Sequence, residues 1–210
     1  MKHYQECQEL FNITKVGKHF FTLRIVETWS IGLNCIGGVI EHLGALTGIG
    51  CSTVNSYRRL WDTGLWAPVY ADWGYQNRTC GLRVSAPGRF EYRAVDSMVN
   101  PYLMAAGLLK AFDDGIKRNL DPGEPEHRNL YEAMEAGKQV KKLPMCLGEA
   151  LDRLATDEVI KSALPGEMYH VYTWYKCDEW ERFLSQTLLS SPYSATLRMG
   201  MRAKPKICGT

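Results

Sequence analysis

The sequence predicts an α+β fold in which an incomplete antiparallel sheet is backed by helices. Three observations support this prediction. Three short segments of strand-like composition follow one another near the middle of the chain, a capped amphipathic helix comes directly after them, and much of the C-terminal part has helical spacing. The 210 residues, 45% of them hydrophobic, are enough to bury a core.

The strand candidates are residues 68–73, 80–85 and 89–95. Each contains β-branched or aromatic residues, and the turn segments GYQNRT and APG separate them. Such short connections are typical of neighbouring antiparallel strands. We therefore expect the three segments to form an antiparallel meander.

Helices are expected before and after this sheet. Residues 35–46 have apolar side chains at helical spacing. A second helix should begin at Asn100-Pro101, because Asn caps a helix well and Pro suits its first position. Residues 147–154 and 166–189 are the remaining helix candidates. The apolar stripe expected on the second helix consists of Leu103, Ala106, Leu109, Phe112 and Ile116.

The bulk composition argues against several classes of function. The formal net charge is +2, so nothing indicates a nucleic-acid-binding surface. The seven cysteines are scattered and never form a CxxC pair, which argues against a zinc site and favours reduced thiols. The N-terminus has no apolar leader and the chain has no run of about 18 apolar residues, so we expect no membrane partner and a cytoplasmic location.

The most informative segment is rich in arginine and lies between residues 55 and 101. Within the last strand candidate, Arg89, Glu91 and Arg93 would share one face while Phe90 and Tyr92 point to the other. The carboxylate could neutralise its neighbours on a solvated sheet face, or it could bind a divalent cation while the arginines bind the accompanying anions. The residues alone leave both interpretations open. The six arginines of this segment are Arg58, Arg59, Arg78, Arg83, Arg89 and Arg93.

Residues 37–131 resemble the C-terminal half of the catalytic domain of the glutamine synthetase family. The resemblance rests on the motifs GGVIEHLGAL, STVNSYRRL, WAPVY and NRTCGLRV, followed by GRFEYRAVDSMVNPYLMAAGLLKAFDDGIKRNLDPGEPEHRNLYE. All occur in the family's order and spacing. The WAPVY and GRFE variants are similar to the bacterial branch that includes γ-glutamylmethylamide synthetases.

This resemblance implies that the chain is a ligase by family, joining the γ-carboxylate of glutamate to ammonia or a small amine at the expense of ATP. It implies glutamate binding by Arg59 and Arg93. It places Arg78, Arg83 and Arg89 at the phosphates of ATP, with Arg78 also acting in catalysis on the phosphoryl group in transit.

The resemblance further implies Mg²⁺ or Mn²⁺ as cofactor, with Glu91 as one of its ligands. Hard carboxylate oxygens suit these ions. The family has a glutamate before Ala-Pro where this chain has Trp66, which leaves the amine acceptor open. A non-catalytic protein of the same fold, or a remnant that binds anions or nucleotides, is the alternative to a ligase.

Family motifs cover only part of the chain. We expect residues 1–34 to be unassigned to the family, residues 35–189 to form a partial catalytic domain, and residues 190–210 to be a disordered tail. The family assembles large homo-oligomeric rings in which an N-terminal domain closes each site. Because the family's N-terminal motifs are missing here, regular rings are not expected of this chain.

Overall fold

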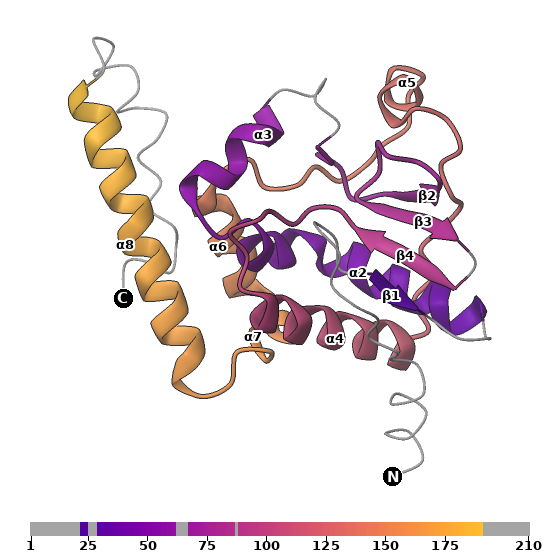
Figure 1. The fold of residues 1–210 in the computed structure, drawn as a ribbon, viewed down its shortest axis with the longest axis horizontal. Coiled ribbons are helices and arrows are strands. Elements are labelled where there is room, and N and C mark those ends of the chain that lie inside the picture. Colours follow the sequence, from indigo (N-terminus) through magenta and orange to yellow (C-terminus); the bar gives the residue numbers. More distant parts are fainter. Residues whose placement is uncertain (1–21, 25–28, 62–66, 87, 191–210) are drawn as a thin grey trace.

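The computed structural model describes residues 22–24, 29–61, 67–86 and 88–190, with side chains described for 30–60, 67–86 and 88–186. The α+β class is confirmed (Figure 1). Trp66 and residues 191–210 of the predicted tail lie outside the described residues. In chain order the elements are β1 (Thr22–Arg24), α2 (Trp29–Gly50), the 3₁₀ helix η1 (Val54–Tyr57), α3 (Arg58–Trp61), β2 (Trp73–Tyr75), β3 (Leu82–Ala86), β4 (Arg89–Tyr92), α4 (Pro101–Lys117), α5 (Leu130–Glu135), α6 (Leu147–Thr156), α7 (Glu158–Lys161) and α8 (Glu167–Ser190).

The sheet is mixed, which corrects the prediction of a purely antiparallel sheet. Its order is β1-β4-β3-β2. β3 and β4 pair antiparallel as expected, and β1 adds antiparallel to β4, but β2 runs parallel to β3 with Trp73 opposite Leu82. β1 comes from the segment for which the sequence makes no assignment.

The loop between β2 and β3 explains the parallel pairing. It begins at Gln76, whose φ is 53°. The Asn77 side chain then holds the loop, since its amide donates to the carbonyl oxygens of Glu126 and Arg128 while its oxygen accepts from the backbone N–H of Thr79. This loop returns the chain to the side on which β2 began, so β3 runs in the same direction as β2.

The first predicted strand, residues 68–73, is mostly not a strand of this sheet. Its backbone bonds instead to a distant segment. The N–H of Ala71 donates to the carbonyl of Lys141 at 2.9 Å, and the N–H of Leu143 donates to the carbonyl of Val69 at 2.8 Å. These residues of β-like composition therefore pair with residues about seventy positions away in the sequence. Composition alone does not reveal which distant segment is the partner.

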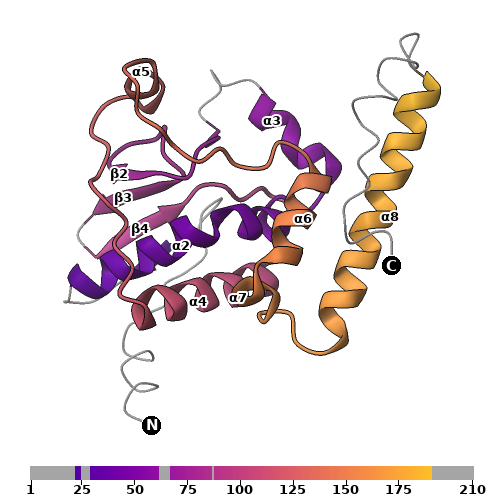
Figure 2. The ribbon, with the colours of Figure 1, turned by 180° about the vertical axis from the view of Figure 1, so that it is seen from behind.

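Helices α2 and α4 cover one face of the sheet (Figures 1 and 2). The main hydrophobic core lies in this layer, where side chains of α2 and α4 meet the inward-facing side chains of β2, β3 and β4. Phe90 and Tyr92 belong to this core, which confirms the predicted alternation along β4. Arg83, Glu91 and their neighbours lie on the opposite face of the sheet.

The helix predicted from Asn100 is confirmed, but its buried stripe is rotated from the predicted one. The Asn100 side chain accepts from the N–H groups of Tyr102 and Leu103 and caps α4. Leu109 is 46% exposed. The buried positions are Met104, Gly107, Leu108, Ala111, Phe112 and Gly115. Three of them are Gly or Ala, which a count of large apolar side chains overlooks.

The C-terminal helices form a second hydrophobic cluster with α3. Here Trp180 of α8 packs over Gly148 of α6, where an added Cβ would meet the Trp180 ring nitrogen at 2.6 Å. None of the described helices is long and apolar enough to cross a membrane. Cys51, Cys80 and Cys146 of the described region are free thiols, whereas Cys177 is disulfide-bonded, so the prediction of reduced thiols is wrong for Cys177.

Candidate anion-binding site on the open face of the sheet

The centre of the predicted site is an ion pair between the two central strands. Arg83 of β3 and Glu91 of β4 are direct partners in the antiparallel register. Arg83 Nη1 lies 2.9 Å from Glu91 Oε2 and 3.1 Å from Oε1. Only 7% of Glu91 is exposed. A guanidinium and a carboxylate that are paired this closely and partly desolvated stabilise each other more than a surface pair would.

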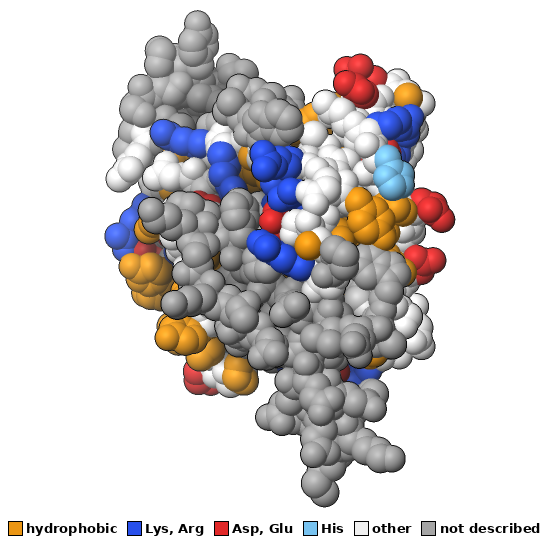
Figure 3. Space-filling model, turned by 45° about the vertical axis from the view of Figure 1, so that its right-hand side comes forward, with side chains coloured by type: hydrophobic (Ala, Val, Ile, Leu, Met, Phe, Trp, Pro, Cys, Tyr) orange, Lys and Arg blue, Asp and Glu red, His pale blue; other side chains and the backbone are white. Residues whose placement is uncertain are grey.

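Three further arginines lie in the electrostatic environment of this pair. Arg89 Nη2 is 3.7 Å from Glu91 Oε1. Burial lowers the pKa of Arg93; the charge of Glu91 opposes this shift, and the positive charges of Arg83 and Arg78 add to it, so that the pKa is lowered overall. Figure 3 shows basic side chains gathered on this face around an acidic one. We call Arg78, Arg83, Arg89 and Arg93 the arginine cluster.

The arginine cluster concentrates guanidinium groups on the open face of the sheet. Four guanidiniums are gathered around one carboxylate, that of Glu91, so positive side chains predominate among the described residues of this face. Guanidiniums bind phosphate and carboxylate oxygens in bidentate fashion and stay charged in a partly buried setting. The arrangement therefore suits a polyanion such as the phosphates of a nucleotide.

Arg59 comes from a different element, α3, and contacts Cys51, whose thiol donates to the carbonyl of Ala94, the residue after Arg93. Arg59 Nη2 donates to Cys51 Sγ at 3.4 Å, and its Nε is buried without a hydrogen-bond partner among the described residues. Burial raises the pKa of the Cys51 thiol more than the nearby charge of Arg59 lowers it. The thiol is therefore protonated and unsuited to act as a nucleophile. Arg59 keeps hydrogen-bonding capacity for another anion.

The described residues do not form a divalent-metal site by themselves. Glu91 is already paired with two guanidiniums, from Arg83 and Arg89. The described part of the chain contains no group of three or more His, Cys, Asp or Glu side chains placed to hold a metal ion. Mg²⁺ requires near-octahedral oxygen coordination. Glu91 could supply one such ligand, and the others would have to come from outside the described residues.

Gln76 belongs to the site, although sequence reasoning did not identify it. Its Oε1 accepts a hydrogen bond from Arg83 Nη2, and its Nε2 donates to the carbonyl of Ser85 at 2.5 Å. Gln76 thus holds the side of the Arg83 guanidinium that Glu91 does not hold. The only signal in the sequence is its position in the GYQNRT turn, next to Asn77-Arg78.

The sequence matches a known family along most of its length. A family model described as "Glutamine synthetase, catalytic domain" matches residues 20–190. The glutamine synthetase of Pyrococcus furiosus is 44% identical over 161 residues, which are 73% of this chain and 36% of the relative. That of Pyrococcus abyssi is 46% identical over 160 residues, which are 72% of this chain and 36% of the relative. The chain thus spans about a third of the length of these relatives.

Solved structures of GmaS, γ-glutamylmethylamide synthetase, have a similar fold. The apo form without ligand aligns with a TM-score of 0.70, covering 90% of this chain and 40% of that one. A complex with ADP aligns with a TM-score of 0.71, covering 90% and 42%. Both are 30% identical in sequence to this chain. By its family match, its curated relatives and its fold, the chain belongs to the glutamine synthetase family.

Proposed function

We propose that this chain carries one side of an ATP-dependent ligase site that joins the γ-carboxylate of glutamate to ammonia or a small amine. In the proposed reaction a γ-carboxylate oxygen attacks the terminal phosphorus of ATP, forming an acyl phosphate and releasing ADP. The amine nitrogen then attacks the acyl carbon, the bond to the phosphate oxygen breaks, and the nitrogen loses a proton. The products are phosphate and a γ-glutamyl amide.

The observation that carries this proposal is the gathering of four guanidiniums around Glu91 on the open face of the sheet. Phosphoryl transfer requires little covalent participation by the protein, so positioning and electrostatic stabilisation provide most of the catalysis. Arg83 is held on two sides, by Glu91 and by Gln76. A guanidinium fixed in this way needs little reorganisation when charge develops on the transferred group.

We assign each arginine a role by its position in the family motifs and in the fold. Arg78, Arg83 and Arg89 bind the ATP phosphates, and Arg78, an exposed side chain in the β2–β3 loop, also stabilises the phosphoryl group in transit. Arg93 and Arg59 bind the carboxylates of glutamate. The buried, unsatisfied Nε of Arg59 is consistent with an anion partner, because an unpaired buried donor is costly.

The proposal also covers the metal ion, the location of the protein and its assembly. Glu91 is proposed as one ligand of Mg²⁺ or Mn²⁺, with the remaining ligands supplied from outside the described residues. We propose a cytoplasmic location, with no nucleic-acid or membrane partner. The chain spans about a third of its curated relatives, so assembly into the family's rings is not proposed for this chain alone.

A hydroxamate assay tests the proposal. The purified chain is incubated with ATP, Mn²⁺, glutamate and hydroxylamine, and γ-glutamyl hydroxamate is measured. We expect turnover that falls by about 100-fold in Arg59→Ala and in Glu91→Ala, the size of effect seen when a preorganised charged contact is lost. The matched control is Arg153→Ala, an exposed arginine on α6, which should keep the activity of the unmodified chain.

One observation favours a second function, nucleotide or anion binding without turnover. The carboxylate of Glu91 is paired with arginine, and the described residues lack a metal-binding group. ATP binding without hydroxamate formation, weakened about tenfold in Arg83→Gln, would support this second function and contradict the ligase. If neither turnover nor ATP binding is detected, both functions are wrong for this chain.

A further inference from the structure

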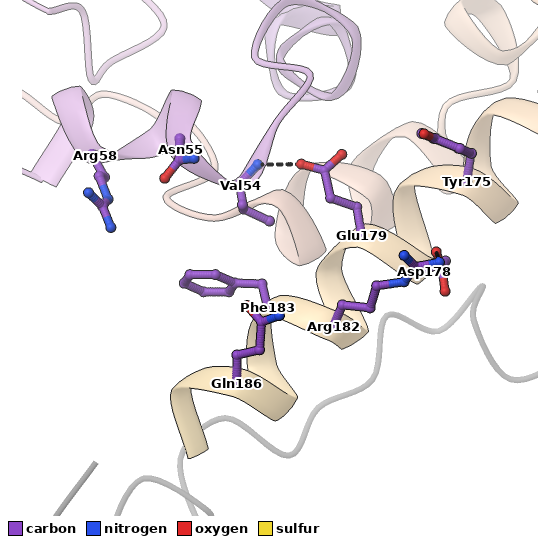
Figure 4. Close-up of a pocket in the computed structure, with 9 residues that line it drawn as sticks. All are labelled: Val54, Asn55, Arg58, Tyr175, Asp178, Glu179, Arg182, Phe183 and Gln186. Atoms are coloured by element: carbon purple, nitrogen blue, oxygen red, sulfur yellow. Dashed lines mark hydrogen bonds and ion pairs between the residues drawn. The ribbon is translucent and has the colours of Figure 1, made fainter. Parts of the chain in front are cut away.

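A cavity lies between η1–α3 and α8. Its volume is about 610 Å³, within the range of about 300–1,000 Å³ that is usual for small-molecule sites. None of the arginine cluster lines this cavity. Figure 4 shows Arg58 and the ring of Phe183 projecting into the space between the two helices.

The acidic side chains that line the cavity are already paired. Glu179 Oε1 accepts from the backbone N–H of Val54 at 3.0 Å, and its Oε2 lies 2.9 Å from Lys176 Nζ. Asp178 Oδ2 lies 2.5 Å from Arg182 Nη2. These contacts neutralise both carboxylates and fix α8 to the start of η1. They leave no unpaired negative charge among the described side chains that line the cavity.

Arg58 provides the remaining charge. Among the described residues its guanidinium has neither a hydrogen bond nor an ion pair, and the side-chain amide of Asn55 has no hydrogen bond either. Both side chains come from the same helical turn. Together they offer an uncompensated positive charge and an amide donor, a combination that fits the two oxygens of a carboxylate.

The wall opposite Arg58 is aromatic. Phe183 is half-buried and stacks on Trp180, with ring centroids 5.7 Å apart, so its ring is held in place. Tyr175 lines the same cavity and is 62% exposed. A rigid aromatic wall near a single free cation favours a ligand with an apolar body and one negative charge. One guanidinium matches one negative charge, so a monocarboxylate suits the cavity better than a phosphate dianion.

We propose that this cavity is a binding site for a small carboxylic acid with an apolar body, bound by Arg58 and Asn55 at its carboxylate and by Phe183 along its body. The site is separate from the proposed ligase site, and its existence does not depend on catalysis. Arg58 directly precedes Arg59 on α3, so a ligand bound here contacts the element that carries Arg59.

The test uses phenylacetate as probe and the full chain. Binding is measured by isothermal titration, and the location is measured by backbone amide shifts. We expect saturable binding, with shifts confined to residues 54–58 and 175–186. Uncharged phenylacetamide and the Arg58→Gln variant should each weaken binding about tenfold, the effect expected when one charge-assisted contact is lost.

Matched variants keep the test decisive. Arg153→Gln removes an exposed arginine outside the cavity and should bind phenylacetate as the unmodified chain does. Arg93→Gln alters the arginine cluster and should also leave the affinity unchanged. Because Arg58 is exposed, its replacement should not change the melting temperature. The proposal is overturned if binding is not saturable, if Arg58→Gln binds normally, or if Arg93→Gln removes the binding.

Discussion

At the scale of single residues, the ion pair between Arg83 and Glu91 is the feature on which the site depends. The first interpretation of the sequence is confirmed for Arg83 and Arg89, which Glu91 pairs with, and the cation-binding interpretation stays a prediction. Glu91 is almost fully buried, whereas Arg89 is 47% exposed at its side chain. The pair of Arg83 and Glu91 is therefore the more deeply buried part of the cluster, and Arg89 lies nearer the surface.

Replacing Glu91 by Gln should destabilise the protein, because Arg83 would keep its charge in a partly buried position without a counter-charge. We expect the free energy of unfolding to fall by about 1–3 kcal/mol, less than for a fully buried pair. Urea denaturation at neutral pH measures this loss. The control is Glu158→Gln, which removes a 79% exposed carboxylate from its pair with Lys161 and should cost less than about 0.5 kcal/mol. Equal losses in both variants would contradict a structural role for Glu91.

At the scale of elements, the contact between α2 and α4 determines how closely the helical layer packs. Gly38 of α2 lies against α4 so closely that an added Cβ would meet the carbonyl oxygen of Ala111 at 2.0 Å. Gly115 of α4 would in turn meet the carbonyl oxygen of Asn34 at 2.2 Å. Small residues on both helices allow this close approach. The large apolar side chains of the two helices lie to one side of this contact.

Gly38→Ala and Gly44→Ala should therefore have opposite effects, although both lie on α2. Gly38→Ala forces the two helices apart and should cost about 1–3 kcal/mol of stability. At Gly44 the nearest atoms are side-chain carbons of Arg153 at 3.6 Å, an ordinary contact, so alanine should stabilise the helix by up to about 1 kcal/mol. Thermal melts of the two variants measure this difference. A destabilised Gly44→Ala together with an unchanged Gly38→Ala would contradict the packing described.

At the scale of the whole molecule, His42 joins the core helices to the C-terminal helices. Its Nδ1 lies 2.7 Å from Asp157 Oδ2, and its Nε2 lies 2.9 Å from Asp114 Oδ2. Ionised carboxylates only accept hydrogen bonds, so both ring nitrogens must donate and the imidazole must be charged. Burial lowers the pKa of His42, but the hydrogen bonds and charges of the two aspartates outweigh burial and raise it overall.

Stability should consequently depend on pH through His42. A raised folded-state pKa contributes stability that is fully present below the ordinary value of 6.5 and is lost as the pH rises through the folded-state pKa. The free energy of unfolding should fall as the pH rises from about 6.5 through the raised folded-state pKa in the unmodified chain, and should stay flatter in His42→Gln. Asp114 and Glu126, whose pKa values are lowered, titrate below this window.

The exposed His127 provides the matched control for this pH dependence. His127→Gln removes a histidine without burial, so the slope should remain that of the unmodified chain. Denaturation curves at a series of pH values are sufficient for all three proteins. If His42→Gln and the unmodified chain have the same slope, His42 does not provide the pH dependence.

Local chemistry was sufficient to predict much of this molecule. Asn100 and Pro101 start α4 because capping depends on neighbouring backbone groups. Phe90 and Tyr92 face the core because side chains alternate along a strand. The arginine cluster was predictable because its members lie on β3 and β4, in the loop before β3 and directly after β4. The antiparallel register of these two strands places Arg83 opposite Glu91.

Other features depend on contacts between residues that are far apart in the sequence. The parallel pairing of β2 with β3 requires Asn77 to bond near Glu126, and the segment around Tyr70 pairs with Lys142. The cavity at Arg58 exists because α8 packs against the start of η1. Composition and periodicity report which residues prefer which local geometry, and they contain no information on which distant partner satisfies a given hydrogen bond. That choice is made only when the layers pack, which is why the sequence suggested the arginines of the candidate site but not the contact of Gln76 with Arg83 or the cavity at Arg58.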